Sequence, residues 1–80
     1  PCLALAIQAA KTGGTAPVVL NGANEIAVTR FLKGDIGFMD IPRLVAHTLK
    51  RMPVIANPTL ADIHSADLEA REIAASKSAI

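Results

Sequence analysis

The chain has 80 residues, a formal net charge of +1, 51% hydrophobic residues and only 2% aromatic residues. This length allows one domain with a thin core, because Ala, Leu, Ile and Val must fill the space that aromatic side chains usually occupy. The sequence excludes a basic nucleic-acid surface interleaved with aromatic residues, a membrane-spanning stretch and an internal disulfide, since Cys2 is the only cysteine.

The first predicted helix covers residues 2–11 and stops at Gly13 and Gly14. Apolar residues surround it almost completely: Leu3, Ala6, Ile7 and Ala10 on one side, and Cys2, Leu5 and Ala9 on the other. Such a helix requires burial on more than one face, which a domain of this size does not readily provide. Together with a start at Pro1 instead of methionine, this predicts a fragment of a longer protein. We expect Cys2 to be a small core residue, because a nucleophile needs a neighbouring base.

The second predicted helix has Thr15 as its N-cap and Pro17 in its first turn, and it runs to about Lys33 before the stop at Gly34. At about 100° per residue, the helix has two opposite sides. The apolar side carries Leu20, Ala23, Ala27 and Phe31, and the other side carries Gly22, Glu25, Thr29 and Lys33.

The segment Leu20–Val28 places two asparagines and a glutamate in this helix. Asn24 falls inside the apolar stripe, Asn21 lies towards its edge and Glu25 lies nearer the solvent. A catalytic role would need a nucleophile and a base that the segment lacks, whereas amide and carboxylate groups can tie neighbouring backbone to the helix. The pattern therefore favours a structural polar network of Asn21, Asn24 and Glu25 over direct ligand contact. Gly22 indicates the close approach of another backbone.

A third helix is predicted from Asp40, which caps it, to the Met52–Pro53 step, after a loop over residues 34–39. Its face towards the core is formed by Ile41, Leu44, Val45, Leu49 and Met52. His47 falls outside this stripe, so we expect it to be exposed to solvent.

A fourth helix is predicted to start at Thr59, which forms a loose capping box with Asp62. An unbroken helix would put Asp67 and Arg71 on its apolar stripe. This mismatch predicts a break near Ser65, followed by a helix in which Asp67 and Arg71 form an i,i+4 ion pair.

Nothing in the chain reads as an internal repeat or a run of paired strands. The sequence therefore predicts an all-α fold, a small bundle of four to five short helices, with residues 76–80 fraying at the end.

Two patterns suggest ligand binding at first sight. His64 has acidic neighbours in Asp62 and Asp67, but metal sites show several ligands at recognisable spacings, and this set does not. The Gly13–Thr15 turn precedes a helix, but it lacks the glycine-rich motif and the preceding strand of phosphate-binding loops. No catalytic, cofactor-binding or metal-binding residue is therefore predicted in this chain.

Several segments occur together in a fixed order: Pro1-Cys2-Leu3, Gly13-Gly14, Leu20-Asn21-x-Ala23-Asn24-Glu25-x-Ala27-Val28, Phe31-Leu32-x-Gly34-x-Ile36-x-Phe38-x-Asp40-Ile41, and Asp67-x-x-Ala70-Arg71. In this order they resemble the C-terminal helical domain of the 1-deoxy-D-xylulose 5-phosphate reductoisomerase family. The resemblance covers nearly the whole chain. One departure is Gly22, where the family favours alanine, and this glycine would loosen the helix locally.

The resemblance implies an NADPH-dependent isomeroreductase of the non-mevalonate isoprenoid pathway. In that family the enzyme converts 1-deoxy-D-xylulose 5-phosphate to 2-C-methyl-D-erythritol 4-phosphate with Mg²⁺ or Mn²⁺. An N-terminal Rossmann domain binds NADPH, and a central domain supplies the metal ligands, the phosphate-binding residues and most of the dimer contact. None of those motifs lies in this chain, so residues 1–80 are expected to form the C-terminal α-helical domain, which is supportive and not catalytic alone.

The resemblance also implies the partners of the chain. These are the remainder of the same subunit, above all its central catalytic domain, within a homodimer, and not a nucleic acid or a membrane. The expected location is the bacterial cytoplasm, with plastids as the alternative. A stand-alone helical adaptor that binds another protein through its first helix is the competing interpretation.

Overall fold

Four α-helices make up the part of the chain that the structure describes: α1 (Cys2–Thr12), α2 (Ala16–Leu32), α3 (Asp40–Arg51) and α4 (Leu60–Ser76). The structure is a computed structural model that describes residues 2–77, with side chains from Leu3 onward. These residues contain no strand, so the predicted all-α bundle is confirmed. The expectations for the Cys2 side chain and for residues 78–80 of the tail lie outside the described residues.

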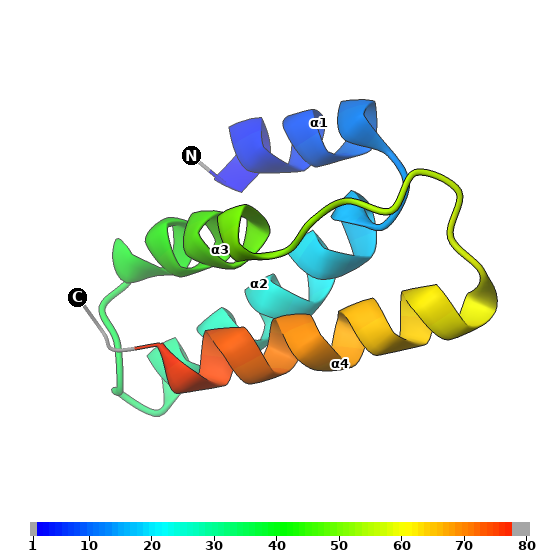
Figure 1. Ribbon diagram of the computed structural model, residues 1–80. Helices are drawn as coiled ribbons and strands as arrows, with labels where there is room; N and C mark the ends of the chain where they lie inside the picture. Colours follow the sequence, from blue (N-terminus) through cyan, green and yellow to red (C-terminus); the bar gives the residue numbers. More distant parts are fainter. Residues whose placement is uncertain (1, 78–80) are drawn as a thin grey trace.

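The central helix is α2, which contacts all three other helices (Figure 1). In this view α1 lies above it and α4 below it, while α3 packs beside α2 and also touches α1 and α4. Because α2 is covered from several directions, its burial pattern is wider than one stripe.

Alanine dominates the contact between α2 and α4. Ala23 and Ala27 of α2 and Ala70 and Ala74 of α4 are each 0% exposed. Such small side chains let two helices approach closely. The predicted core face of α3 is confirmed, with Leu49 partly buried and the other members buried, namely Ile41, Leu44, Val45 and Met52.

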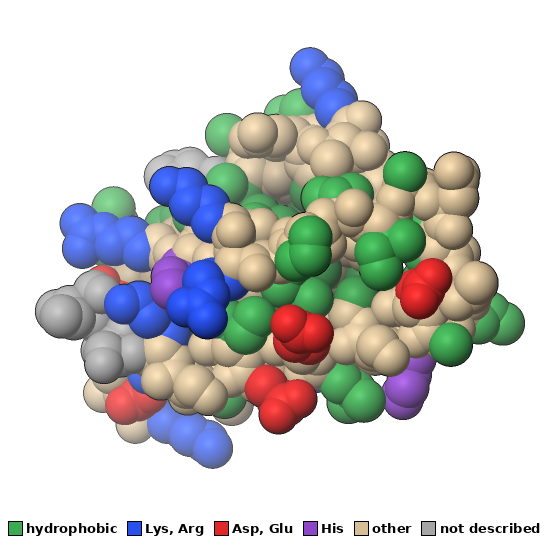
Figure 2. Space-filling view, in the orientation of Figure 1, with side chains coloured by type: hydrophobic (Ala, Val, Ile, Leu, Met, Phe, Trp, Pro, Cys, Tyr) green, Lys and Arg blue, Asp and Glu red, His purple; other side chains and the backbone are tan. Residues whose placement is uncertain are grey.

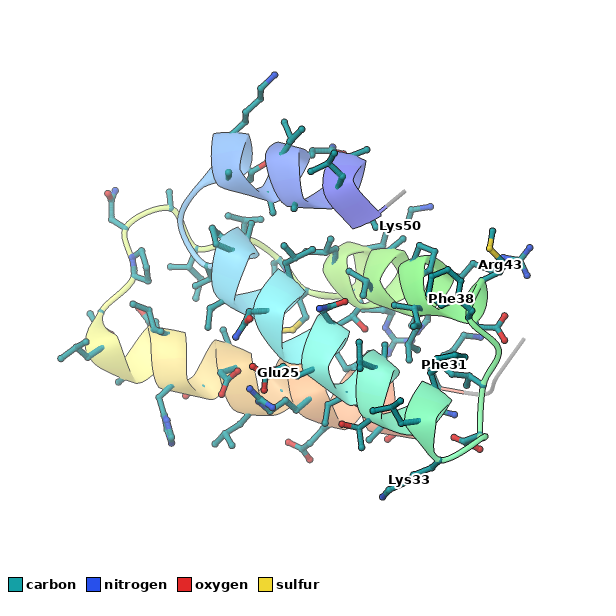
Figure 3. The ribbon with its side chains drawn as sticks, turned by 180° about the vertical axis from the view of Figure 1, so that it is seen from behind. Glu25, Phe31, Lys33, Phe38, Arg43 and Lys50 are labelled. Atoms are coloured by element: carbon teal, nitrogen blue, oxygen red, sulfur yellow. The ribbon has the colours of Figure 1, made fainter. Side chains whose placement is uncertain are left out.

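The two phenylalanines meet where α2 leads into α3. The rings of Phe31 and Phe38 meet edge to face, with centroids 5.7 Å apart and an interplanar angle of 66° (Figure 3). This geometry suits the ring quadrupoles. It holds the loop of residues 33–39 against the end of α2.

The start of α4 and the end of α2 follow the local signals in the sequence. Thr59 Oγ1 accepts a hydrogen bond from Asp62 N at 3.1 Å, and Asp62 Oδ2 accepts one from Thr59 N at 3.0 Å. The predicted capping box is therefore confirmed. Gly34 follows α2 with a φ of +79°, a conformation that glycine adopts without strain.

The two other predicted caps serve different partners. Thr15 is the N-cap residue of α2, as predicted, but its side chain makes no capping hydrogen bond: its Oγ1 accepts from Ile55 N at 3.0 Å, and Thr15 N donates to Ile55 O at 3.1 Å. Asp40 is the first residue of α3, and its Oδ2 accepts from Gly37 N in the preceding turn at 2.8 Å. The prediction that these side chains cap their helices is wrong. Thr15 instead fastens the connector between α3 and α4 to the α1–α2 turn.

Candidate functional site

A cluster of charged side chains joins α2 to α4. The Arg71 guanidinium donates from Nη2 to Glu25 Oε1 of α2 and from Nε to Asp67 Oδ1 of its own helix, each at 3.0 Å. Figure 3 shows Glu25 on the part of α2 that lies against α4. Hydrogen bonds to Glu25 and then to Asp67 raise the pKa of Arg71 above its ordinary value. The predicted pair of Asp67 and Arg71 is confirmed, and Glu25 extends it across the helix interface.

Gly22 explains why charged residues occupy the inner side of α4. It is buried, and a Cβ added there would lie 2.9 Å from Asp67 Oδ1 and 3.4 Å from Arg71 Cγ. The absent side chain leaves room for both charged groups between the helices. The helix Leu60–Ser76 therefore runs without interruption, and the predicted break near Ser65 is wrong. The sequence pattern of α4 alone could not show this, because the space for the charged side chains comes from Gly22 on α2.

The three residues of the predicted polar network take different positions. Glu25 pairs with Arg71, and Asn21 Nδ2 donates to Glu25 Oε2 at a long 3.4 Å. Asn24 is exposed, so the expectation that it lies inside the core is wrong. The helical wheel directs Asn24 correctly towards α1 and α3, but those helices leave a hollow there instead of covering it. The joint structural role of the three residues stays a prediction.

Arg30 ties the end of α4 to α2, which the sequence analysis missed. Its Nη1 donates to the main-chain oxygens of Ala74 and Lys77, each at 2.7 Å, and its Nε donates to Asp35 Oδ2 at 2.6 Å. The last carbonyls of a helix have no donor within the helix, so the guanidinium supplies one. The available signal was the place of Arg30 two turns after the buried Ala23 on the same face of α2.

A basic hollow lies between α3 and the end of α4. It is bordered by His47, Arg51, Glu72, Ile73, Ser76 and Lys77. Figure 2 shows Lys and Arg side chains gathered around a histidine on this face. Partial burial, and then the positive charges of Lys77 and Arg51, lower the pKa of His47 below 6.5. His47 lies outside the core face of α3, as expected, and is partly rather than fully exposed, because the end of α4 borders the same hollow.

The side chains and main-chain groups of residues 2–77 show no arrangement suited to binding a metal ion or a phosphate group. No group of three His, Cys, Asp or Glu side chains in this range could hold a metal ion. His64 is exposed, Asp62 serves the capping box and Asp67 pairs with Arg71. At the start of α2, Thr15 N already donates to Ile55 O, so this turn is not a free phosphate cradle. None of the helices described has the length and apolar character needed to cross a membrane.

Comparison with known proteins identifies close relatives of this sequence. A family model described as the DXP reductoisomerase C-terminal domain matches residues 1–73. The chain is 51% identical over 73 residues to the 1-deoxy-D-xylulose 5-phosphate reductoisomerase of Xanthomonas euvesicatoria pv. vesicatoria, a match that covers 91% of this chain and 18% of the relative. It is 54% identical over 71 residues to the protein of the same name from a Synechococcus species, covering 89% of this chain and 18% of that relative.

The fold has a close counterpart among solved structures. The 1-deoxy-D-xylulose 5-phosphate reductoisomerase from Zymomonas mobilis, solved in complex with NADPH, superposes with a TM-score of 0.85 at 44% sequence identity. The match covers 92% of this chain and 20% of that one. The chain thus spans about a fifth of the length of the relatives that it resembles.

Proposed function

The chain belongs to the family of DXP reductoisomerase C-terminal domains, and from this premise we propose that residues 1–80 form the C-terminal helical domain of a larger, multidomain reductoisomerase. In this proposal the whole enzyme rearranges 1-deoxy-D-xylulose 5-phosphate and reduces the product with NADPH to 2-C-methyl-D-erythritol 4-phosphate, a step of non-mevalonate isoprenoid biosynthesis. It uses Mg²⁺ or Mn²⁺, bound outside this domain.

One observation carries the proposal: half of the aligned residues are identical to a reductoisomerase along 91% of the chain. The solved relative from Zymomonas mobilis was obtained with NADPH, which supports NADPH as the cofactor of the whole enzyme. The described residues bring together no group that could hold a metal ion. We therefore assign the reacting groups to the remainder of the subunit.

The role proposed for this domain is structural support. The cluster of Glu25, Asp67 and Arg71 and the contacts of Arg30 fix α4 on α2. This internal bracing suits a rigid body that packs against other domains of its subunit. For the whole enzyme we propose a homodimer in the bacterial cytoplasm, with plastids as the alternative location and with neither nucleic acid nor membrane as a partner.

The competing interpretation, a stand-alone adaptor, has less support. It would not explain why the sequence is about half identical to reductoisomerases along nearly the whole chain. It retains one structural argument, which is the exposure of Leu3 and Ile7 on α1, at 74% and 49%. A domain that packs on the rest of its own subunit accounts for the same exposure.

An activity measurement on the 80-residue chain tests whether the reacting groups lie outside it. Mixed with NADPH, Mg²⁺ and 1-deoxy-D-xylulose 5-phosphate, the chain should oxidise no NADPH. A reductoisomerase of known activity, assayed in parallel, is the positive control. Substrate-dependent turnover by the chain alone would overturn the proposal that the reacting groups lie elsewhere.

A further inference from the structure

We propose that a hollow at the start of α1 is the docking face for the polypeptide that precedes this domain in the longer reductoisomerase, and that its occupant is a neutral, extended segment with apolar side chains. The hollow lies among Leu3 and Ala6 of α1, Leu20, Asn21 and Asn24 of α2, and Val45 of α3. We call it the α1–α2 hollow. The inference rests on the proposed function, since it requires that further polypeptide exists.

The lining of the α1–α2 hollow fits an apolar occupant. Its volume is about 480 Å³, and none of its lining residues is charged. Leu3, at its rim, is 74% exposed. An exposed leucine beside an uncharged depression leaves apolar area available for burial by a partner.

Asn24 adds a polar group that suits a main chain. Its side chain carries two N–H donors and a carbonyl acceptor, and none of the described residues forms a hydrogen bond with it. An amide matches the donor and acceptor of a peptide group, so it can bind an extended segment without a charge on either side. Asparagine is also a poor residue for the interior of a helix. A hydrogen bond from its amide to a docked segment would offset that cost.

The position of the hollow favours the preceding polypeptide over other occupants. The match is to a C-terminal domain and spans only 18–20% of the relatives, so in those proteins most of the polypeptide comes before it. That polypeptide joins the domain at the start of α1, where Leu3 and Ala6 border the hollow. Residues that directly precede α1 can therefore reach the hollow without a long linker.

The test compares Asn24→Arg with Thr29→Arg, in the 80-residue chain and in the longer protein that contains it. Both positions are exposed polar residues of α2, and both changes add one positive charge. Circular dichroism of each chain variant first establishes that it is folded. Limited proteolysis of the longer protein then measures how fast this domain is released.

Under the proposal, Asn24→Arg speeds release of the domain by about tenfold or more, the effect of losing one important interface contact. Thr29→Arg leaves the release rate unchanged, and neither variant changes the melting temperature of the chain alone by more than a few degrees. Equal release rates for the two variants would overturn the proposal. So would a large loss of stability by Asn24→Arg in the chain alone, because the side chain would then belong to the core of the domain.

A second copy of the chain is the competing occupant. Sedimentation of the chain would reveal such a dimer as a mass that rises with concentration. A dimer that Asn24→Arg abolishes, together with an unchanged rate of domain release in the longer protein, would overturn the proposal in favour of the second copy. NADPH oxidation by the unmodified longer protein is measured separately. An inactive protein with the expected proteolysis pattern would refute the proposed function and leave the docking face standing.

Discussion

Replacing Gly22 by alanine tests the contact between α2 and α4, because two effects oppose each other there. Glycine inside a helix costs about 0.5–1 kcal/mol relative to alanine, so the methyl group should stabilise α2. The new Cβ would, however, lie 2.9 Å from Asp67 Oδ1 and push that carboxylate away from Arg71. An i,i+4 ion pair contributes only about 0.3–0.5 kcal/mol, and this carboxylate sits on a side chain that can rotate. The gain should therefore exceed the loss.

The expected net stabilisation by Gly22→Ala is about 0.5 kcal/mol, which raises the melting temperature by roughly 2–4 °C in a domain of this size. Gly22→Val is the matched control. Its γ-methyl groups would reach towards Asp67 O, a main-chain atom only 3.5 Å from the ideal Cβ. Overpacking of this kind costs about 1–3 kcal/mol, so the valine variant should melt at least 4 °C lower, by roughly the same conversion.

Thermal unfolding of the chain followed by far-ultraviolet circular dichroism measures both variants. The alanine gain should grow slightly when Asp67 is also replaced by alanine, because no ion pair is then left to displace. A clear fall in melting temperature for Gly22→Ala would refute the argument that the Asp67 carboxylate can move aside at little cost. An unchanged value for Gly22→Val would refute the proposed packing of the two helices.

Three further predictions concern other parts of the bundle. Arg30→Met should lower the free energy of unfolding by about 2–3 kcal/mol in urea titrations, because the main-chain oxygens of Ala74 and Lys77 lose a charged donor; an unchanged value would contradict this role. Stability should fall as the pH drops below about 6.5, since the unfolded chain takes up a proton that His47 in the folded chain resists; His47→Gln should reduce this fall, and an identical pH series for both proteins would refute it. Asn24→Leu should not lower the melting temperature of the chain, because Asn24 is exposed, whereas a drop of several degrees would show that it is buried.

Features encoded by neighbouring residues could be predicted from the sequence. The capping box joins Thr59 and Asp62, which lie three residues apart, so the sequence shows both partners of the contact. The glycine that follows α2 is likewise recognised from its position next to the helix. The core face of α3 was also predicted correctly, because its apolar residues repeat with the helical period.

Features that depend on distant residues could not be predicted in the same way. The break expected near Ser65 came from judging α4 without the surface that it faces, and Gly22 of α2 provides that surface. The wheel gave the direction of Asn24 but not whether a neighbouring helix covers it. Thr15 bonds to Ile55, forty residues along the chain, so its local neighbours give no sign of that contact.

In the proposed function, this helical domain supports a reductoisomerase without supplying its reacting groups. The most direct measurement is NADPH oxidation that depends on 1-deoxy-D-xylulose 5-phosphate and Mg²⁺, using the longer protein intact and with residues 1–80 removed. The intact protein should be active, the activity should be lost after the removal, and the 80-residue chain alone should have none. An inactive intact protein would refute the proposed reductoisomerase activity, and full activity after the domain is removed would refute its supporting role.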